Sequence, residues 1–406
     1  MPTIRVAIPA MDELNYLPVT LDALSRQETD RSFEVYVCVN QPESYWEAPA
    51  GRLVCEHNQQ LLEYLHHYDF LTLHVLDRTS SGKGWPKGKT GVGHARRVLF
   101  DSILSVSEPD DLLVSMDADT LVESNYLQSV ADNFSKHPEM SALAVPYYHR
   151  LDSKDETATR AMLRYEIYMR NYAINLLKIN SPYGFTALGS AIVMRAKALR
   201  KIGNITPLQS GEDFYLVQKF CKMGGLRLFN SECVFPACRY SDRVPFGTGP
   251  AMKQGAQGIW DSYPIYHHSF FEPINEAYRH LEDLYKGLFN DNDFLAFLQK
   301  DNTQEEIWAT IRHNVSDFPH FVKAFHQKAD GLRILQYARQ KHAKHSYPEH
   351  IALFENVHTW WPDRCPQWFS KNQSLDHYSI PQLNELRNLL FEEENVLRKH
   401  YCDKHS

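Results

Sequence analysis

Two pairs of acidic residues have the spacing and the local context of groups that take part in chemistry. The first pair, Asp117 and Asp119, lies two residues apart in "SMDADT", directly after the apolar run "LLV". Carboxylate oxygens are hard ligands, and a Mg²⁺ or Mn²⁺ ion held by one or two of them also binds substrate phosphates. We therefore predict that Asp119 and Asp117 bind Mn²⁺ or Mg²⁺. The alternative is that one acid caps the following helix and the other is solvated.

The second pair is Glu212 and Asp213 in "SGEDFYLVQKF", where the pattern predicts the start of a helix. Acidic residues in the first turn interact favourably with the helix dipole, which would account for both of them structurally. The chemical alternative is a carboxylate that takes a proton from a hydroxyl group, a role that raises reaction rates roughly 10²–10⁴-fold. We assign catalysis to Asp213 as this base, with Glu212 beside it.

The loop "SGKGWPKGKTG" at residues 81–91 has the composition of a phosphate-binding loop but not its spacing. A Walker loop has four residues between its two glycines, so that successive backbone N–H groups converge on one phosphate. In this loop the two glycines before Gly88 are separated from it by five and three residues, and Pro86 lies between. The spacing argues against a nucleotide triphosphatase.

Segments of strand and helix alternate around these residues. Apolar runs with the character of buried strands occur at residues 4–10, 33–40, 71–78, 111–120 and 140–150, and helical patterns lie between several of them. Such alternation predicts an α/β fold with a doubly wound, mostly parallel sheet and helices on both faces. Ligands bind beyond the carboxyl ends of the strands in such sheets. The acids and the loop fall at these ends, so we predict that they share one site.

Composition narrows the class of protein. The 406 residues are 43% hydrophobic and 12% aromatic, which is enough for a packed core, and the net charge of −7 is not gathered in blocks. We therefore expect no nucleic-acid partner. The seven cysteines form no CxxC pair and are odd in number, which indicates a reducing compartment. With no signal peptide and no apolar run of about 18 residues, we expect a cytoplasmic protein without a transmembrane segment.

The order of these motifs resembles that of the family 2 glycosyltransferases, which have the GT-A fold. The resemblance rests on "AIPAMDE", "GVGHARRVLFDSI", "SMDADT", "TALGSAIVMRAKALRKIG" and "GEDFYLVQKFCKMG". It implies a nucleotide-sugar-binding catalytic domain over residues 1–245 and a mainly helical region over residues 246–406. It also implies metal-dependent transfer of a sugar from a nucleotide-diphosphate donor to an acceptor hydroxyl, in a single displacement that inverts the anomeric centre.

The resemblance implies roles for individual residues. Asp119 would hold the metal, Asp117 would hold the ribose or the metal, and Asp213 would deprotonate the acceptor hydroxyl. The residues that would border the base and the ribose are Ala7, Pro9 and Glu13, and the other predicted donor contacts are Asn40, Lys83, Lys89, Gly93, Arg96, Asp117 and Arg243.

The glycine-lysine loop then has an interpretation of its own. Lys83, Lys87 and Lys89 would line the mouth of the nucleotide-sugar pocket. Gly91 and Gly93 would permit close approach of the backbone to the ligand. The alternative is a solvated basic loop with no ligand.

Several residues outside these motifs are further candidates. His149, His267 and His268 would complete the metal sphere, or are packed or solvated as single histidines usually are. Arg243 in "CRYSDRVPFGTG" would contact the diphosphate or form a structural ion pair. The aromatic segment at residues 358–369 would stack on a sugar ring or form the core of the helical region.

Two features depart from the family pattern. The second strand usually ends in an Asp that reads the nucleotide, whereas "VCVNQPES" offers Asn40 and Gln41. No Q-x-x-R-W motif follows Asp213, which predicts a non-processive enzyme. The acceptor is left open between a glycan, a lipid-linked sugar and a small molecule, and so is peripheral contact of the C-terminal region with a membrane.

Two other functions compete with this interpretation. A nucleotidyltransferase would share the sheet and a metal-binding acid, but "IPAMDELNYLP" lacks the glycine- and arginine-rich loop expected after its first strand. A non-catalytic carbohydrate-binding or scaffold protein with a decayed site has no need of the acids, whereas both acidic pairs are present.

Overall fold

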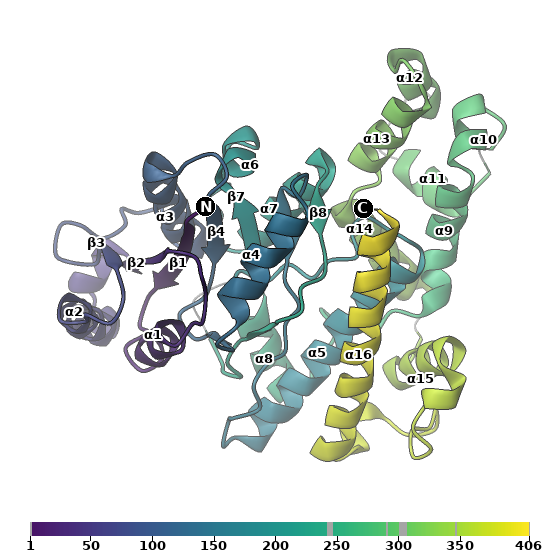
Figure 1. Ribbon diagram of the computed structural model, residues 1–406. Helices are drawn as coiled ribbons and strands as arrows, with labels where there is room; N and C mark the ends of the chain where they lie inside the picture. The colour runs from purple at the N-terminus through teal and green to yellow at the C-terminus, as the bar shows by residue number, and fades with distance from the viewer. Residues whose placement is uncertain (1, 242–246, 290, 300–306, 346, 406) are drawn as a thin grey trace. The chain divides into compact units, whose positions relative to one another are not determined.

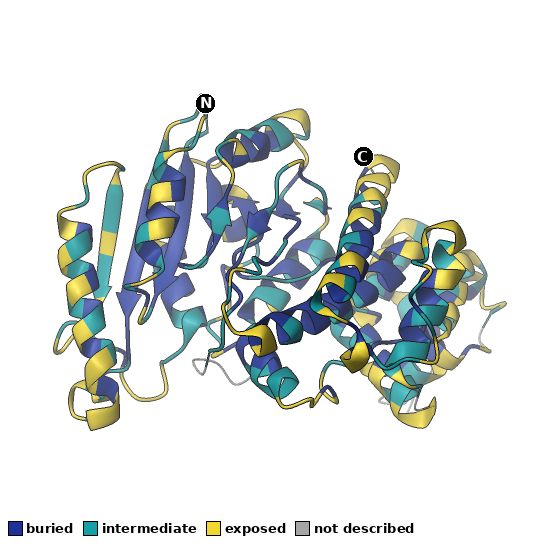
Figure 2. Ribbon diagram, turned by 90° about the horizontal axis from the view of Figure 1, so that it is seen from below, coloured by how far each residue is buried: buried dark blue, intermediate teal, exposed yellow. Residues whose placement is uncertain are grey.

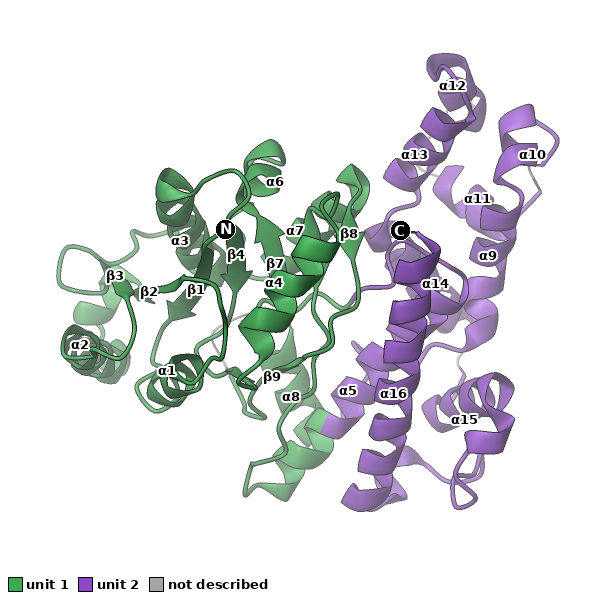
Figure 3. Ribbon diagram, in the orientation of Figure 1, with its two compact units in different colours: residues 1–162, 186–258 green, residues 163–185, 259–406 purple. Residues whose placement is uncertain are grey.

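The computed structural model of the chain describes residues 2–241, 247–289, 291–299, 307–345 and 347–405. These residues form two compact units, which Figure 3 colours separately. Unit 1 comprises residues 1–162 and 186–258, and unit 2 comprises residues 163–185 and 259–406. Helix α5 (Glu156–Lys178) begins in unit 1 and continues into unit 2.

Unit 1 is built on a seven-stranded sheet with the strand order β3-β2-β1-β4-β7-β6-β8 (Figure 1). Strands β1 to β4 run parallel, whereas β7 is antiparallel to both of its neighbours. The prediction of a mostly parallel α/β sheet is therefore confirmed. The strands are β1 (Ile4–Ala10), β2 (Phe33–Asn40), β3 (Leu73–Arg78), β4 (Leu112–Ser115), β6 (Ala142–Ala144), β7 (Ile192–Arg195) and β8 (Leu226–Arg227), and a separate antiparallel pair joins β5 (Leu121–Val122) to β9 (Val234–Phe235).

Helices pack against the sheet and bury its central strands. α3 (Val92–Val106) packs against β1, β2 and β4, α2 (Arg52–His66) against β2 and β3, and α7 (Glu212–Met223) against β6 and β8. Every residue of β1 is buried, whereas the edge strand β3 keeps partial exposure (Figure 2). Burial of an aliphatic side chain such as Ile8 stabilises the fold by about 1.5–3 kcal/mol. The buried strand β1 therefore holds the polar residues that follow it in a fixed position. Unit 1 also contains α1 (Leu17–Ser25), α4 (Tyr126–Lys136), α6 (Ala196–Lys201) and α8 (Thr248–Ala256).

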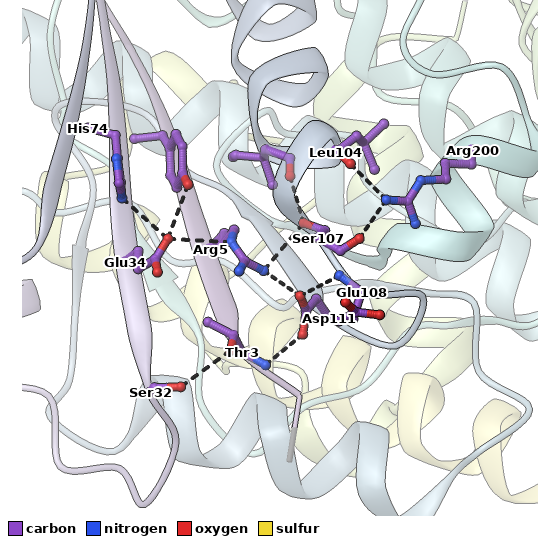
Figure 4. A network of polar contacts seen from close by, with 12 residues as sticks. Thr3, Arg5, Ser32, Glu34, His74, Leu104, Ser107, Glu108, Asp111 and Arg200 are labelled. Carbon is purple, nitrogen blue, oxygen red and sulfur yellow. Dashed lines mark hydrogen bonds and ion pairs between the residues drawn. The ribbon is translucent and has the colours of Figure 1, made fainter.

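A polar network lies at the amino-terminal end of the central strands (Figure 4). Asp111 accepts hydrogen bonds from the backbone N–H groups of Thr3 and Glu108, both at 2.8 Å. It also pairs with Arg5 on β1, and Arg5 contacts Glu34 on β2 at 3.4 Å. The network joins two strands to the turn before β4. It lies at the end of the sheet opposite to the one where ligands bind, so we assign it a structural role.

Unit 2 is helical in the part of the chain that the structure describes. Its C-terminal helix α16 (Ile380–Lys404) begins at a capping box formed by Ser379 and Gln382. Arg170 on α5 donates a hydrogen bond to Glu394 on α16 at 2.7 Å, and both side chains are buried. Among the described residues, no helix is long and apolar enough to cross a membrane. The other helices are α9 (Glu272–Arg279), α10 (Leu281–Lys286), α11 (Asp293–Gln299), α12 (Ile307–Asn314), α13 (Phe318–Lys328), α14 (Gly331–His345) and α15 (Glu349–Trp360).

The aromatic segment at residues 358–369 contributes to the packing of unit 2. Phe369 is buried, and its ring contacts that of Tyr378 with 5.7 Å between centroids. Trp360 and Trp361 contact each other edge-on and keep partial exposure. These contacts favour the interpretation of the segment as core, and stacking on a sugar ring stays a prediction.

Candidate active site

One pair of the predicted catalytic and metal-binding acids follows a strand of unit 1, and the other pair begins a helix. Asp117 and Asp119 come directly after β4, and the backbone N–H of Met116 still bonds to β1 at 3.1 Å. Glu212 and Asp213 form the first turn of α7. The two pairs meet through Arg96, so the structure brings together acids that the sequence predicted for one site.

Arg96 on α3 joins the two acidic pairs. Its guanidinium donates one hydrogen bond to Asp117 and another to Glu212. The side chain is buried, and a Cβ atom at Gly189 would lie 1.8 Å from Nη2 of Arg96, so a larger residue there would displace the guanidinium. This explains the glycine of "TALGSA". The sequence predicted Arg96 as a donor contact, and the structure places its guanidinium between two acids.

Asp213 has the electrostatics of a base that works near neutral pH. Burial raises the pKa of Asp213, and the neighbouring Glu212 raises it further, to about 7, although Arg96 acts in the opposite direction. Its Oδ1 accepts a hydrogen bond from the backbone N–H of Phe214 at 2.7 Å, which fixes the carboxylate at the helix start. Gly211 precedes this turn with φ 75°, a left-handed conformation that suits glycine.

Arg239 contacts Asp119, the other acid predicted to bind the metal, and the sequence predicted no role for Arg239. Its Nε donates to Oδ2 of Asp119 at 2.6 Å, and its Nη2 donates to Oε1 of Glu13 at 2.6 Å. The guanidinium lies over the ring of Tyr16, 4.2 Å from the centroid. The signal in the sequence was only that a basic residue follows the last strand of the domain, β9.

The start of α3 packs against the segment before Glu212. A Cβ atom at Gly93 would lie 2.2 Å from the backbone oxygen of Leu208, and one at Gly91 would lie 2.9 Å from Cα of Gln209. At these two glycines the backbone approaches other backbone of unit 1, and the predicted close approach to a ligand stays a prediction. These contacts join the helix that carries Arg96 to the segment that leads into α7, where the predicted base lies.

The glycine-lysine loop is held by carboxylates. Glu43 accepts hydrogen bonds from the backbone N–H groups of Gly82 at 2.8 Å and Gly84 at 2.7 Å. Nζ of Lys83 contacts Asp77 at 2.9 Å. Burial raises the pKa of Asp77, but hydrogen bonds from the Ser80 backbone and from Lys83 outweigh it and lower the pKa to about 2. Because backbone donors of the loop already bind a carboxylate, the structure agrees with the spacing that argued against a Walker loop.

The remaining predicted donor contacts differ in how accessible they are. Lys87 and Lys89 are exposed. Asn40 is buried, donates to the backbone oxygen of Ala10 at 2.9 Å and accepts from Nε1 of Trp85 at 3.0 Å. Pro9 lies within the buried strand β1, as Ala7 does. Asn40 thus links the ends of two strands to the loop, which is a framework role.

The other candidates fall elsewhere. Arg243 lies outside the described residues. His149 is buried in unit 1 with its ring against that of Tyr147. His267 is in unit 2, where Nδ1 contacts Ser269 at 2.7 Å and Nε2 contacts Glu355 at 3.0 Å. Its neighbour His268 belongs to the same unit, and the two rings are in contact.

The donor set suits a hard divalent cation in part. Asp117 and Asp119 offer carboxylate oxygens, which Mg²⁺ and Mn²⁺ prefer. Within the described ranges, no group of three or more His, Cys, Asp or Glu side chains is arranged to hold a metal ion. The residues therefore fit an ion that takes most of its ligands from water and from substrate phosphates.

Comparison with known proteins assigns the chain to a family. A sequence profile described as glycosyltransferase-like family 2 matches residues 2–228, more than half of the chain. The chain belongs to this family. The prediction of a glycosyltransferase that uses a nucleotide-sugar donor is therefore confirmed. A search among curated proteins finds no match.

Solved structures of similar fold come from distant glycosyltransferases. S. aureus TarS 1–349, solved with UDP-GlcNAc, is 13% identical with a TM-score of 0.43, and the match covers 100% of this chain and 93% of that one. Mannosyltransferase PcManGT from Pyrobaculum calidifontis, solved with GDP-Man and Mn²⁺, is 12% identical with a TM-score of 0.36 and coverages of 97% and 87%. Glucosyl-3-phosphoglycerate synthase from Mycobacterium tuberculosis is 13% identical with a TM-score of 0.34 and coverages of 64% and 78%.

Proposed function

We propose that this glycosyltransferase inverts the anomeric centre of its donor sugar and that Asp213 is the catalytic base. The observation that carries the proposal is the position of Asp213 in the first turn of α7, with a pKa raised to about 7 by burial and by Glu212. A base works best when its pKa lies near the operating pH, because it is then both ionised and basic enough to take a proton. Arg96 holds Glu212 in place beside it.

We propose that the reaction is a single displacement and that the enzyme is non-processive. The acceptor oxygen forms a bond to the anomeric carbon while the bond from that carbon to the diphosphate oxygen breaks. The leaving diphosphate takes the electron pair of that bond, and the acceptor proton passes to the carboxylate of Asp213. Because the acceptor attacks from the side opposite to the leaving group, an α-linked donor sugar gives a β-linked product.

Asp119, together with Asp117, would hold a Mn²⁺ or Mg²⁺ ion. Such an ion, when bound, neutralises the charge that develops on the departing diphosphate. The two carboxylates have the right chemistry for it, and Arg96 fixes the position of Asp117 by a partly buried hydrogen bond. The chain thereby contributes acidic ligands whose orientation is set before the donor binds.

The donor-binding residues divide into direct and indirect contacts. We propose direct contacts for Glu13, Lys83 and Lys89, which lie at or beyond the carboxyl ends of strands. Asn40 and Gly93 would act indirectly, because their observed contacts shape the backbone of the site. The acceptor class stays open between a glycan, a lipid-linked sugar and a small molecule. We also propose a cytoplasmic location, which the seven free cysteines support.

A thermal-shift screen of nucleotide sugars tests the proposal. A ligand that binds only the folded protein raises the free energy of unfolding, by about 2.7 kcal/mol at one hundred times its Kd. The melting temperature rises with it. We expect at least one UDP-, GDP- or ADP-sugar to raise the melting temperature, more strongly with Mn²⁺ than with EDTA. In Asp119→Asn the Mn²⁺-dependent part of the shift should disappear. A panel with no shift under any condition would overturn the proposal.

A further inference from the structure

The side chain of Asp119, the proposed metal ligand, already forms an ion pair with an arginine. Arg239 donates from Nε to Asp119 and from Nη2 to Glu13, with both distances at 2.6 Å. The side chain of Asp119 is 15% exposed and that of Glu13 is 4% exposed, so both charges are largely shielded from water. A buried carboxylate that lacks a charged partner is strongly destabilising. Arg239 therefore balances two acids that would otherwise repel each other.

The geometry of Arg239 also determines where Asp119 points. The guanidinium is planar, and it uses separate N–H groups for the two acids while lying over the ring of Tyr16 at 4.2 Å. Glu13 and Tyr16, which follow β1, and Asp119, which follows β4, thus fix the side chain of Arg239. Another arginine, Arg150, donates to the backbone oxygen of Asp119 at 3.2 Å, and not to its carboxylate.

We propose that Arg239 is a positioning residue that competes with the divalent cation for Asp119. The inference rests on the proposed metal site at Asp119. The carboxylate that accepts from Arg239 is the proposed metal ligand, and a divalent ion bound to it would lie near a guanidinium of like charge. Metal binding therefore loosens the contact of Arg239 with Asp119, while Glu13 keeps the guanidinium in the site.

The competition has a consequence for the order of binding. In the free protein, Arg239 already satisfies Asp119, so the metal alone binds weakly. A nucleotide diphosphate brings a new anion for the loosened guanidinium and new ligands for the metal, so the donor and the metal assist each other. Arg239 thereby makes the protein take up the metal together with its donor.

A purely structural role for Arg239 predicts the opposite sign. If Arg239 only held Asp119 in a shape that the metal requires, its removal would lower the affinity for the metal. Under competition its removal raises that affinity, because the shielded carboxylate of Asp119 loses the guanidinium that binds it. The direction of the change in metal affinity distinguishes the two roles.

The test measures Mn²⁺ binding to the full chain without donor, by calorimetry and by the loss of the free Mn²⁺ signal in electron paramagnetic resonance. We expect Arg239→Gln to raise the Mn²⁺ affinity by a factor between about 5 and 150, the usual range for coupled ligands. Arg239→Lys, which keeps the charge but loses the planar fork, should shift the affinity in the same direction by less. Arg150→Gln removes one nearby positive charge without freeing a carboxylate of the pair, so its Mn²⁺ affinity should stay close to that of the wild type.

The outcomes separate the inference from the proposed function. If Arg239→Gln does not fold, which circular dichroism would show, the sign of the change in Arg239→Lys decides the question. An unchanged or lowered affinity in the folded variant, with normal binding in the wild type, would overturn the competition and leave the metal site intact. If neither wild type nor variants bind Mn²⁺, even with a nucleotide sugar, the metal site itself is wrong and the competition with it.

Discussion

Replacement of the proposed base should make the protein more stable while it abolishes transfer. Burial and Glu212 raise the pKa of Asp213 from its usual 3.8 to about 7. Between these two values the folded state binds more protons than the unfolded state, so the contribution of Asp213 to stability falls as the pH rises. Above about pH 7 the native state carries the full cost of an ionised carboxylate in this place. Asp213→Asn removes that cost and keeps an oxygen for the N–H of Phe214.

The rise in pKa sets a ceiling on this stabilisation. At 1.36 kcal/mol for each pKa unit, the ceiling is about 4 kcal/mol, and we expect about half of it because Glu212 shares the repulsion and the surroundings relax. For a unit of this size each kcal/mol moves the melting temperature by about 2–4 °C, so Asp213→Asn should melt about 4–8 °C higher at pH 8. The gain should be smaller at pH 5 than at pH 8.

Calorimetry of wild type and Asp213→Asn from pH 5 to pH 8.5 checks the size and the sign. Asp111→Asn is a control, because Asp111 is a buried carboxylate in the structural network at the other end of the sheet. That variant should melt lower than the wild type and keep its affinity for the donor. An Asp213→Asn protein that is less stable at pH 8, or whose gain does not depend on pH, would refute the assignment of a raised pKa.

Three further predictions follow from the contacts of the site. Asp119→Asn should lose Mn²⁺-dependent donor binding in calorimetry while its circular dichroism spectrum stays unchanged, and an undiminished donor affinity would remove Asp119 from the metal site. Lys83→Ala and Lys89→Ala should each raise the KM for the donor with little change in kcat, and the wild type should hydrolyse no ATP, so steady Mg²⁺-dependent ATP turnover would revive the Walker interpretation. Gly189→Ala should displace the guanidinium of Arg96, lower the melting temperature and reduce kcat by about tenfold or more, since about 1.4 kcal/mol of lost positioning corresponds to a factor of ten; normal kinetics in that variant would show that the guanidinium is not needed where it lies.

The sequence predicted the location of the acids because a general rule covers it. Side chains that follow parallel strands collect at one edge of the sheet, whatever the details of the loops. The rule covers Asp117 and Asp119, which follow β4, and the contacts of Arg96 with Asp117 and Glu212 bring the first turn of α7 to them. The identity of the motifs and their order along the chain were enough for the family as well.

The partners of those acids could not be predicted from the sequence. Arg239 contacts Glu13 across 226 positions and Asp119 across 120, and no spacing rule links residues so far apart. The glycines at the start of α3 were ambiguous for a physical reason. A missing Cβ admits a ligand or another stretch of backbone equally well, and at Gly93 the structure shows backbone.

The grouping of residues 163–185 with the C-terminal part of the chain was not predicted. A helix that runs from one unit into the next shows no change of composition that would mark the boundary.

The stereochemistry of donor turnover tests the central claim most directly. Each nucleotide sugar of a panel is incubated with Mn²⁺ and wild-type protein, with water as the acceptor, and is followed by proton NMR. The anomeric coupling constant shows which anomer of the sugar is released first. We predict that at least one α-linked donor yields the nucleoside diphosphate and, before mutarotation, the β-anomer, and that Asp213→Asn binds this donor without releasing sugar. Release of the α-anomer, or turnover by Asp213→Asn at a near-normal rate, would contradict a single displacement with Asp213 as the base.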